Sequence, residues 1–396
     1  MANVSSSSGL EKRPKLRFPG FDEPWSIYKA EELFKNITDK NHPTETVLTI
    51  IQGKGTLPRE QAGRNIHYDD ASLANYKKVE QGDFIIHLRS FEGGLEMANE
   101  DGIVSPAYTI LRCKKPHSSL FYEAYFHTDE FINHILSKSV EGIRDGRQIS
   151  YEAFKWLGLP YCNVSEQEKI AQLFCTFSHR IEKQQQMVDA LKKYKRGVIQ
   201  QVFAGRKGTG KACYPEWQQS SLGEYFTEQT IRTSNTPSTP LVSLTVEDGI
   251  TPKTGRYYRE FLVTKEGENY KMIKPGWFAY NPMNAHLGAI APNHLGYTAA
   301  VSGYYNIFSV NEPDTICFWE EYLTSYSMLI YYKLIATGSL IEKQRVHYSQ
   351  FVRIRRCLPS VEEQKHLSKL FETLNKKIAN AESTERRLVG MRVSFL

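Results

Sequence analysis

Two stretches of the chain place hydrophobic residues at alternating steps of three and four. In the first stretch, from about Val164 to Val202, these residues are Ile170, Phe174, Phe177, Ile181, Val188, Leu191, Val198 and Val202. In the second they are Leu367, Phe371, Leu374, Ile378, Ala381, Leu388 and Phe395. Polar residues fill two slots of each series, namely Gln184, Lys195, Glu385 and Arg392. This heptad spacing predicts two long helices, each with a narrow apolar stripe.

A narrow apolar stripe cannot be buried by one helix alone in water, so the two helices are expected to pack together as an antiparallel pair. Their interface would be formed by the two stripes. A helix over residues 164 to 202 would be about 60 Å long at 1.5 Å per residue, long enough to act as a spacer. Two alternatives stay open: the stripes belong to the core of a helical bundle, or they join two copies of the chain.

The rest of the chain alternates short apolar runs with turns that contain glycine or proline, which is typical of β-strands. These runs occur twice in the same order, and both copies contain an Asn-Tyr-Lys segment that leads to a turn glycine, Gly82 or Gly276. The offset between copies grows only from 192 to 197 residues. The matching segments are 25–34 with 217–226, 47–59 with 241–253, 75–86 with 269–280, 102–111 with 300–308, 150–154 with 347–351, and 164–174 with 361–371.

A duplicated sequence folds as two copies of one unit, so the predicted fold class is α+β. We expect two pseudo-repeated α/β globules separated by two long antiparallel coiled-coil helices. The expected limits are a tail over 1–15, a first globule over 16–160, a spacer helix over 161–204, a linker over 205–215, a second globule over 216–357 and a C-terminal spacer helix over 358–396.

Composition narrows the function only slightly. Fifty Lys and Arg against 44 Asp and Glu give the 396-residue chain a formal charge of +6, which suits a polyanionic partner without requiring one. The six cysteines lie far apart with no C-x-x-C pair, so neither a zinc cluster nor a disulfide framework is indicated. The first residues contain no apolar run of the kind found in signal peptides, so a cytoplasmic protein is expected.

An ordered set of motifs resembles the specificity subunits of type I restriction-modification enzymes over nearly the whole chain. The motifs are LRFPGF followed by Trp25, GDFIIH (82–87), VSPAY (104–108), GIRDGRQISYEAF (142–154) and the LP…EQEKI opening of the first helix (159–170). The second copy departs from the pattern, with PGWF in place of the Gly-Asp strand and VSGYY in place of VSPAY. Such divergence is expected if the two globules recognise different bases.

The resemblance implies a non-catalytic subunit with two target-recognition domains, each contacting one half of a bipartite, asymmetric DNA site. The helix pair would set the spacing between the half-sites and dock the partner subunits. The implied partners are double-stranded DNA, two methyltransferase subunits and restriction subunits. No cofactor is expected on this chain, because S-adenosylmethionine, ATP and Mg²⁺ would be bound by the partner subunits.

Loops that combine basic and amide side chains are the candidate DNA contacts, because cations bind phosphates while Asn and Arg can recognise base edges. In the first globule these are Lys54, Arg59, Arg64 and Arg89, and in the second they are Lys253, Arg256, Arg259, Asn281, Asn284, His286 and Asn293. The turns before the two helices add Arg144, Arg147 and Arg345. The alternative is that these residues are solvated loop charges or helix caps.

Two motifs suggest catalysis but are incomplete. The segment Gly205–Ala212 matches a phosphate-binding loop except that Ala212 replaces the Mg²⁺-ligating Ser or Thr. Met283 interrupts the N-P-P-[FY] motif of amino-methyltransferases after Asn281 and Pro282. The chain has no H-E-x-x-H motif and no nuclease carboxylate cluster with its lysine, so no metal site is expected. The remaining rival to a DNA-recognition subunit is a coiled-coil scaffold whose globules bind proteins.

Overall fold

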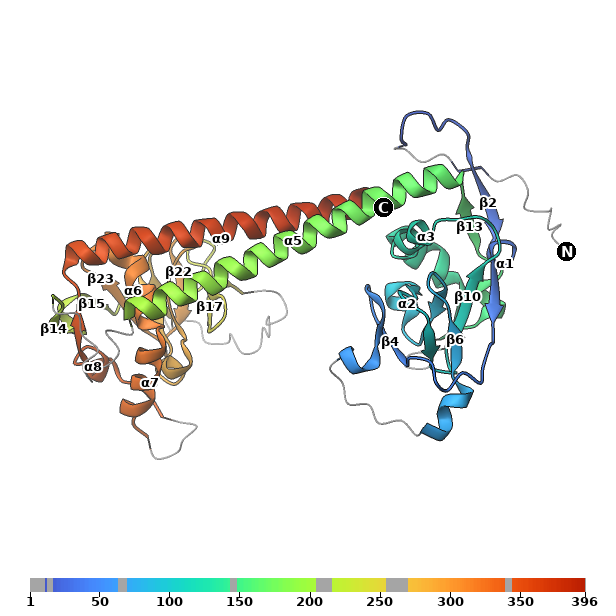
Figure 1. Ribbon diagram of the computed structural model, residues 1–396. Coiled ribbons are helices and arrows are strands. Elements are labelled where there is room, and N and C mark those ends of the chain that lie inside the picture. Colours follow the sequence, from blue (N-terminus) through green and yellow to red (C-terminus); the bar gives the residue numbers. More distant parts are fainter. Residues whose placement is uncertain are drawn as a thin grey trace. The chain divides into compact units, whose positions relative to one another are not determined.

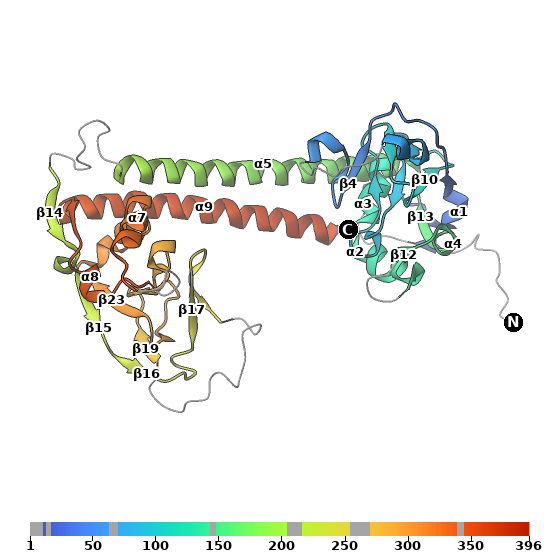
Figure 2. The same ribbon diagram turned by 90° about the horizontal axis from the view of Figure 1, so that it is seen from below.

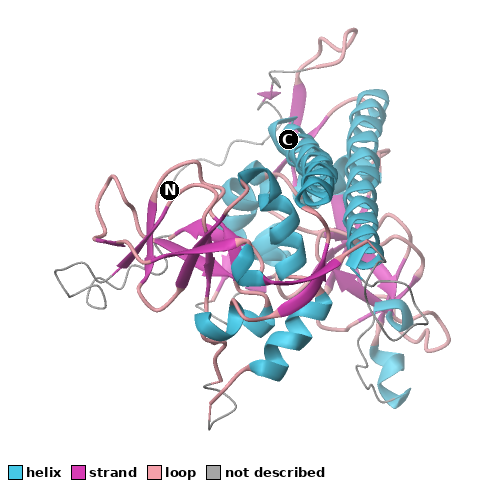
Figure 3. Cartoon of the chain, turned by 90° about the vertical axis from the view of Figure 1, so that its left-hand side faces the viewer, coloured by secondary structure: helices cyan, strands magenta, loops and turns pink. Residues whose placement is uncertain are grey.

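The computed structural model describes residues 11–12, 17–62, 70–142, 148–203, 216–253, 270–338 and 344–395. These residues fall into two compact units, which we describe separately. Unit 1 comprises residues 1–185 together with 384–396, and unit 2 comprises residues 186–383. Figure 1 labels their helices and strands, and Figure 3 colours the chain by secondary structure.

Unit 1 is built around an antiparallel sheet whose strand order is β3-β10-β7-β8. A hairpin, β4-β5, and a strand pair, β6-β9, lie beside it, and β1-β2-β13 form a further sheet. The strands are β1 (Glu11–Lys12), β2 (Trp25–Lys29), β3 (Phe34–Ile37), β4 (Leu48–Ile51), β5 (Gly55–Pro58), β6 (Lys77–Val79), β7 (Phe84–Ile86), β8 (Glu96–Met97), β9 (Gly102–Val104), β10 (Thr109–Cys113), β11 (Val140–Glu141), β12 (Gln148–Ile149) and β13 (Gly158–Tyr161).

The core of unit 1 is aromatic. The rings of Phe34, Phe84, Tyr122, Phe126 and Phe131 are fully buried and meet largely edge to face, with 4.9 Å between the centroids of Phe84 and Phe126. These rings bring helix α3 onto the sheet, because the strands supply two of them and α3 supplies two more. The helical segments are α1 (Ala30–Leu33), η1 (Arg59–Ala62), η2 (Asp70–Asn75), α2 (Ser90–Gly93), α3 (Ser119–Phe126), η3 (Glu130–Ile135), η4 (Leu136–Ser139) and α4 (Tyr151–Phe154).

Unit 2 repeats this arrangement. Its main sheet has the order β15-β23-β20-β21, which corresponds strand for strand to that of unit 1. Its strands are β14 (Gln218–Ser221), β15 (Phe226–Gln229), β16 (Arg232–Thr233), β17 (Val242–Thr245), β18 (Gly249–Pro252), β19 (Tyr270–Ile273), β20 (Phe278–Tyr280), β21 (Ile290–Pro292), β22 (Ala299–Ser302), β23 (Asn306–Val310) and β24 (Arg355–Leu358). Its shorter helical segments are η6 (Leu222–Glu224), η9 (Ala285–Leu287), η10 (Pro313–Thr315), α6 (Ile316–Leu323), α7 (Tyr326–Ile335) and α8 (Tyr348–Phe351).

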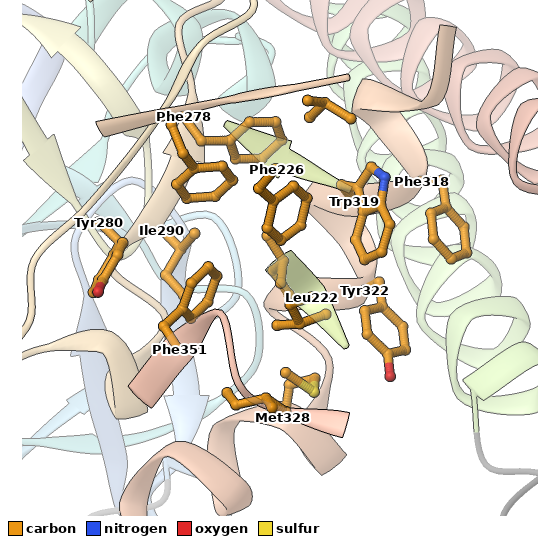
Figure 4. Close-up of a cluster of buried hydrophobic side chains, with 14 of the residues drawn as sticks. Leu222, Phe226, Phe278, Tyr280, Ile290, Phe318, Trp319, Tyr322, Met328 and Phe351 are labelled. Carbon is orange, nitrogen blue, oxygen red and sulfur yellow. The ribbon is translucent and has the colours of Figure 1, made fainter. Parts of the chain in front are cut away.

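The register of the strands confirms the predicted duplication. Phe84 pairs with Leu111 in unit 1, and Phe278, at the matching sequence position, pairs with Phe308 in unit 2. Gly82 and Gly276, predicted to lie in turns before these strands, have φ values of 90° and 78°, a region that residues with a Cβ rarely adopt. Figure 4 shows the core of unit 2, with Phe226, Phe278, Trp319 and Phe351 among its buried rings. The copies share a topology although their core side chains differ.

The two predicted long helices are present as α5 (Val164–Phe203) and α9 (Val361–Phe395). α5 follows the sheet-rich part of unit 1 along the chain and ends in unit 2. Within unit 2 the two helices are antiparallel, because Phe203 contacts Phe371 at 5.9 Å between ring centroids while Lys192 reaches Glu382 at 2.7 Å. Figures 1 and 2 both draw them side by side there.

The apolar stripes contribute to more than the helix pair. Ile170 packs against the core of unit 1, and Leu367 and Phe371 belong to the core of unit 2 together with Phe318 of α6. The stripe therefore fastens each helix to its own globule over its first turns, a role that the heptad pattern did not predict. Of the predicted interface residues, Phe174, Phe177, Val188, Phe371, Leu374 and Leu388 are buried, whereas Ile170, Ile181, Leu191, Leu367 and Ile378 are half-buried.

Candidate nucleic-acid interface

Lys54 lies at the tip of the β4-β5 hairpin, where its side chain is exposed. Beneath it, the carboxylate of Glu96 accepts hydrogen bonds from the backbone N–H groups of Gly53, at 2.7 Å, and Gly55, at 2.9 Å. The imidazole Nε2 of His127 lies 3.3 Å from the same carboxylate. The hairpin tip is therefore attached to the body of unit 1 through a buried acid.

The charges of this buried pair support each other. Burial by itself would raise the pKa of Glu96, but hydrogen bonds from His127, Gly53 and Gly55 together hold that pKa below its ordinary value. Burial likewise opposes the protonation of His127, but the hydrogen bonds to Glu96 and to the carbonyl of Glu123, with the charges of both acids, outweigh burial, so the pKa of His127 is raised. Among the described residues, neighbouring His87 has no hydrogen-bond partner at its buried Nε2, and desolvation lowers its pKa.

Arg59 lies near several aromatic rings beside this hairpin. Its guanidinium lies 6.0 Å from the ring centroid of Tyr76, a cation–π distance. Lys77 donates a hydrogen bond from Nζ to the carbonyl of Tyr108 at 2.5 Å, and the ring of Tyr108 contacts His87 with 6.5 Å between centroids. Cations interleaved with aromatic rings suit a nucleic-acid backbone and its sugars. The sequence predicted Arg59 alone, because these rings come from separate segments.

An acid neutralises Arg89. It lies just after His87, and its guanidinium forms an exposed ion pair with Glu92 at 2.6 Å. An exposed pair of this kind is weak, about 0.2–1 kcal/mol, so a phosphate could displace the carboxylate.

In unit 2 the structure brings four predicted residues together. Asn281, Asn284 and His286 occupy one loop, which is closed by a hydrogen bond from the backbone N–H of Asn281 to the carbonyl of Ala289 at 3.0 Å. The segment containing Arg345 runs beside this loop, since the N–H of the next residue, Val346, donates to the carbonyl of Pro282 at 2.9 Å. The side chain of Asn284 is exposed. The loop therefore offers amide and imidazole groups, and the guanidinium of Arg345 lies over the ring of Tyr304, 5.1 Å from its centroid.

Two further candidates in unit 2 have contrasting surroundings. Asn293 is 2% exposed; its side-chain amide donates to the carbonyls of Ile273 and Tyr297, and its Oδ1 accepts from the N–H of Leu295. All these groups belong to the same unit, so Asn293 holds the turn after β21 in place. Lys253 lies at the exposed end of β18. Arg64, Arg144, Arg147, Arg256 and Arg259 lie outside the described residues.

Solved structures align with this chain over almost its whole length. The type I restriction-modification S subunit from M. genitalium aligns over 96% of this chain and 97% of its own, with a TM-score of 0.56 and 12% identity. A chain from a structure of complex assembly and conformational transition in the type I R-M system aligns over 96% and 98%, with a TM-score of 0.54 and 13% identity.

This chain has the fold of a type I restriction-modification S subunit. The HsdS subunit from Thermoanaerobacter tengcongensis aligns over 97% of both chains with a TM-score of 0.48 and 14% identity. No family model matches the sequence, and no curated protein matches it. At identities of 12–14% the likeness concerns the arrangement of the chain, and the side chains of the candidate interface are this protein's own.

In this S-subunit fold, a repeated contact joins each globule to the helix that follows it. Trp25 donates from Nε1 to Glu166, and Trp217 donates in the same way to Glu363, both at 3.1 Å. In unit 1 the guanidinium of Arg17 adds two hydrogen bonds to Glu166, at 2.9 and 2.8 Å. Sequence alignment of the copies identified the Trp and the EQ motif as repeats but did not predict that they touch.

The S-subunit fold of this chain offers no metal centre in the part that the structure describes. Its His, Cys, Asp and Glu side chains form no group of three that could hold an ion there. Within the same residues, no helix combines the length and apolar character needed to span a membrane.

Proposed function

We propose that this protein is the DNA-recognition subunit of a type I restriction-modification complex and performs no catalysis itself. The observation that carries the proposal is the full-length S-subunit fold, in which two copies of one sheet arrangement are joined by α5 and α9. A duplicated unit with different surface residues is suited to recognise two unlike half-sites.

In this proposal residues 16–160 and 216–357 are the two target-recognition domains. The first would contact DNA through Lys54, Arg59 and Arg89, and the second through the loop of Asn281, Asn284 and His286 with Arg345 beside it. Lysine and arginine would bind phosphates, and asparagine would recognise base edges, for which a bidentate contact to adenine is the common geometry. Each domain would thus contribute its own half of an asymmetric site.

The helices would set the distance between half-sites. α5 contains 40 residues, which corresponds to about 60 Å at 1.5 Å per residue. The contacts of Trp25 with Glu166 and of Trp217 with Glu363 support this role, because they tie each globule to the first turns of a helix. A spacer can fix a distance only if its ends are held firmly.

Partner methyltransferase subunits would dock on the helix pair. Within unit 2 a cavity of about 990 Å³ lies between α5, α9 and the α6–α7 junction. Apolar Phe203, Leu329 and Ile378 line it, and charged Arg196 and Glu382 are among its other lining residues. Such a combination fits a helix of a partner protein. The methyltransferase and restriction subunits would supply the S-adenosylmethionine, ATP and Mg²⁺ chemistry.

The decisive experiment is to map methylated adenines in the host genome with and without this gene, and then to measure binding of the complex to the mapped site. We expect methylation at a bipartite sequence that disappears with the gene, and binding that weakens steeply with salt. A scaffold that binds only proteins predicts unchanged methylation and no sequence-selective DNA binding, and that result would refute the proposal.

A further inference from the structure

The turn of the β4-β5 hairpin is held by side chains from another part of unit 1. Glu96 of β8 accepts hydrogen bonds from the N–H groups of Gly53 and Gly55 through its two carboxylate oxygens. Asn99 donates from Nδ2 to the carbonyls of Lys54, at 2.8 Å, and Thr56, at 2.9 Å. Every one of these backbone groups is thereby bonded, and Lys54 is the one charged side chain of the exposed turn Gln52-Gly53-Lys54.

Close packing makes this turn intolerant of change. Glu96 is 0% exposed, and a buried carboxylate is costly unless it is paired and hydrogen-bonded. Gly55 has φ of 74°, and a Cβ added there would lie 2.6 Å from the carbonyl oxygen of Met97. The backbone of the hairpin therefore lies directly against β8 and the residues after it, and the position of Lys54 is set by Glu96 and Asn99.

Unit 2 contains the same hairpin without this clamp. Thr245 pairs with Gly249 as Ile51 pairs with Gly55, so each turn has three residues. Ala291 occupies the register position of Glu96, since it pairs with Ala279 as Glu96 pairs with Ile85. The turn of unit 2 is Val246, Glu247 and Asp248, so an acid stands where unit 1 has Lys54.

This internal comparison separates folding from function. The hairpin of unit 2 forms with Ala291 at the clamp position, and its turn is closed locally by a hydrogen bond from the N–H of Asp248 to Thr245 Oγ1 at 3.0 Å. The fold therefore does not require a buried acid at that place. In unit 1 the clamp formed by Glu96 and Asn99 occurs together with a lysine at the tip of the turn. This indicates that the clamp positions Lys54 and is not needed to form the hairpin.

We propose that Glu96 is a positioning residue that presents Lys54 to the DNA backbone of the first half-site, and that the acidic turn of unit 2 makes no corresponding contact. The inference rests on the proposed DNA-recognition function. A preordered turn loses little conformational entropy when its lysine binds a phosphate. The free energy of the charge attraction therefore contributes to binding without being offset by the cost of ordering the loop. The two domains would then approach DNA with different loops although they share one topology.

The test uses the full-length protein in its methyltransferase complex, bound to duplex DNA that carries the mapped site. The variants are Lys54→Gln, Glu96→Gln and the double variant. The glutamine introduced by Glu96→Gln would keep the side-chain volume but present an amide NH₂ to one of the two glycine N–H groups, which loses its acceptor. We expect Lys54→Gln to weaken binding several-fold and to reduce the slope of log K against log salt by about 0.9, as for one lost phosphate contact.

The decisive quantity is the coupling between the two positions. Glu96→Gln should weaken binding and lower the salt slope in the wild-type background, but should have little further effect once Lys54 is gone. Asn99→Ala, which frees the carbonyl of Lys54 from the other side, should behave like Glu96→Gln. Asp248→Asn is the matched control in unit 2 and should leave binding unchanged or slightly tighter.

The possible results distinguish this inference from the function on which it rests. Equal losses from Glu96→Gln with and without Lys54, or no loss at all, would overturn the positioning role while leaving DNA recognition intact. Thermal unfolding of each variant separates a misfolded domain from a displaced lysine, and Asn99→Ala supplies the answer if Glu96→Gln does not fold. If the wild-type complex shows no selective binding, the proposed function itself fails.

Discussion

The indole Nε1 of Trp25 donates a hydrogen bond to the carboxylate of Glu166, 141 residues later in the chain, at 3.1 Å. Arg17 completes this contact with two hydrogen bonds to the same carboxylate, which is 1% exposed. The contact closes the sheet β1-β2-β13 onto the first turn of α5. This buried acid therefore helps to orient the helix relative to its own globule, together with the packing of Ile170 and Ala171.

Replacing Glu166 with Ala should destabilise unit 1 strongly. The change leaves the guanidinium of Arg17 and the indole N–H of Trp25 without their acceptor, and breaking a buried charged pair typically costs about 3–5 kcal/mol. The equivalent Glu363→Ala should cost less, about 1–2 kcal/mol, since Glu363 is only half-buried. Urea unfolding of the full-length protein would measure both. Equal decreases in the free energy of unfolding would contradict the prediction that the more buried acid contributes more to stability.

His127 should make the stability of unit 1 depend on pH. Its pKa is raised above 6.5 by Glu96, against the effect of burial, so its stabilising contribution is complete below pH 6.5 and is lost as pH rises through the folded-state pKa. The pKa of Glu96 is lowered, so its contribution is present above its ordinary value of 4.5 and is lost in acid.

The difference in melting temperature between wild type and His127→Gln should therefore be largest near pH 6 and shrink toward pH 9. His134→Gln is the control, because His134 makes only an exposed contact with Asp129 at 3.7 Å. A difference that stays constant from pH 6 to pH 9 would show that His127 is not charged in the folded protein.

Single substitutions in the two units should affect different half-sites. Arg59→Ala should weaken binding several-fold at the first half-site, almost regardless of its bases, because it removes a phosphate contact. Asn284→Ala should relax base preference in the second half-site by about 1–3 kcal/mol. Binding to DNA libraries randomised in one half-site at a time would measure both. A substitution in one unit that changed binding at the other half-site would contradict the assignment of one half-site to each unit.

Lengthening the helix pair should move the half-sites apart without changing their bases. One heptad adds about 10.5 Å, or roughly three base pairs, to a helix. Because α5 and α9 run antiparallel with Lys192 beside Glu382, matched insertions after Leu191 in α5 and after Glu382 in α9 should preserve their packing. Adenine methylation mapping would report the new spacing. If the number of base pairs between the half-sites did not change, the helices would not be what sets that distance.

Periodicity and duplication were sufficient to predict the fold class. A stripe of Leu, Ile and Phe at heptad spacing predicts a long helix that must pack against a neighbour, so α5 and α9 followed from local chemistry. Gly82 and Gly276 likewise predicted their turns, because a positive φ is a local property of the backbone. The duplicated order of segments then required two copies of one sheet arrangement.

The candidate site depended on contacts between distant segments, which local patterns do not encode. The sequence marked Lys54 and Asn293 alike as exposed polar loop residues, yet only the tertiary structure decided that Lys54 is held outward by Glu96 while Asn293 is buried in hydrogen bonds to its own unit. Sequence alone determined which segments become strands and helices, because hydrophobic period and turn chemistry act within a few residues. The folded chain decided which polar groups are satisfied by one another, because that depends on which strands come together.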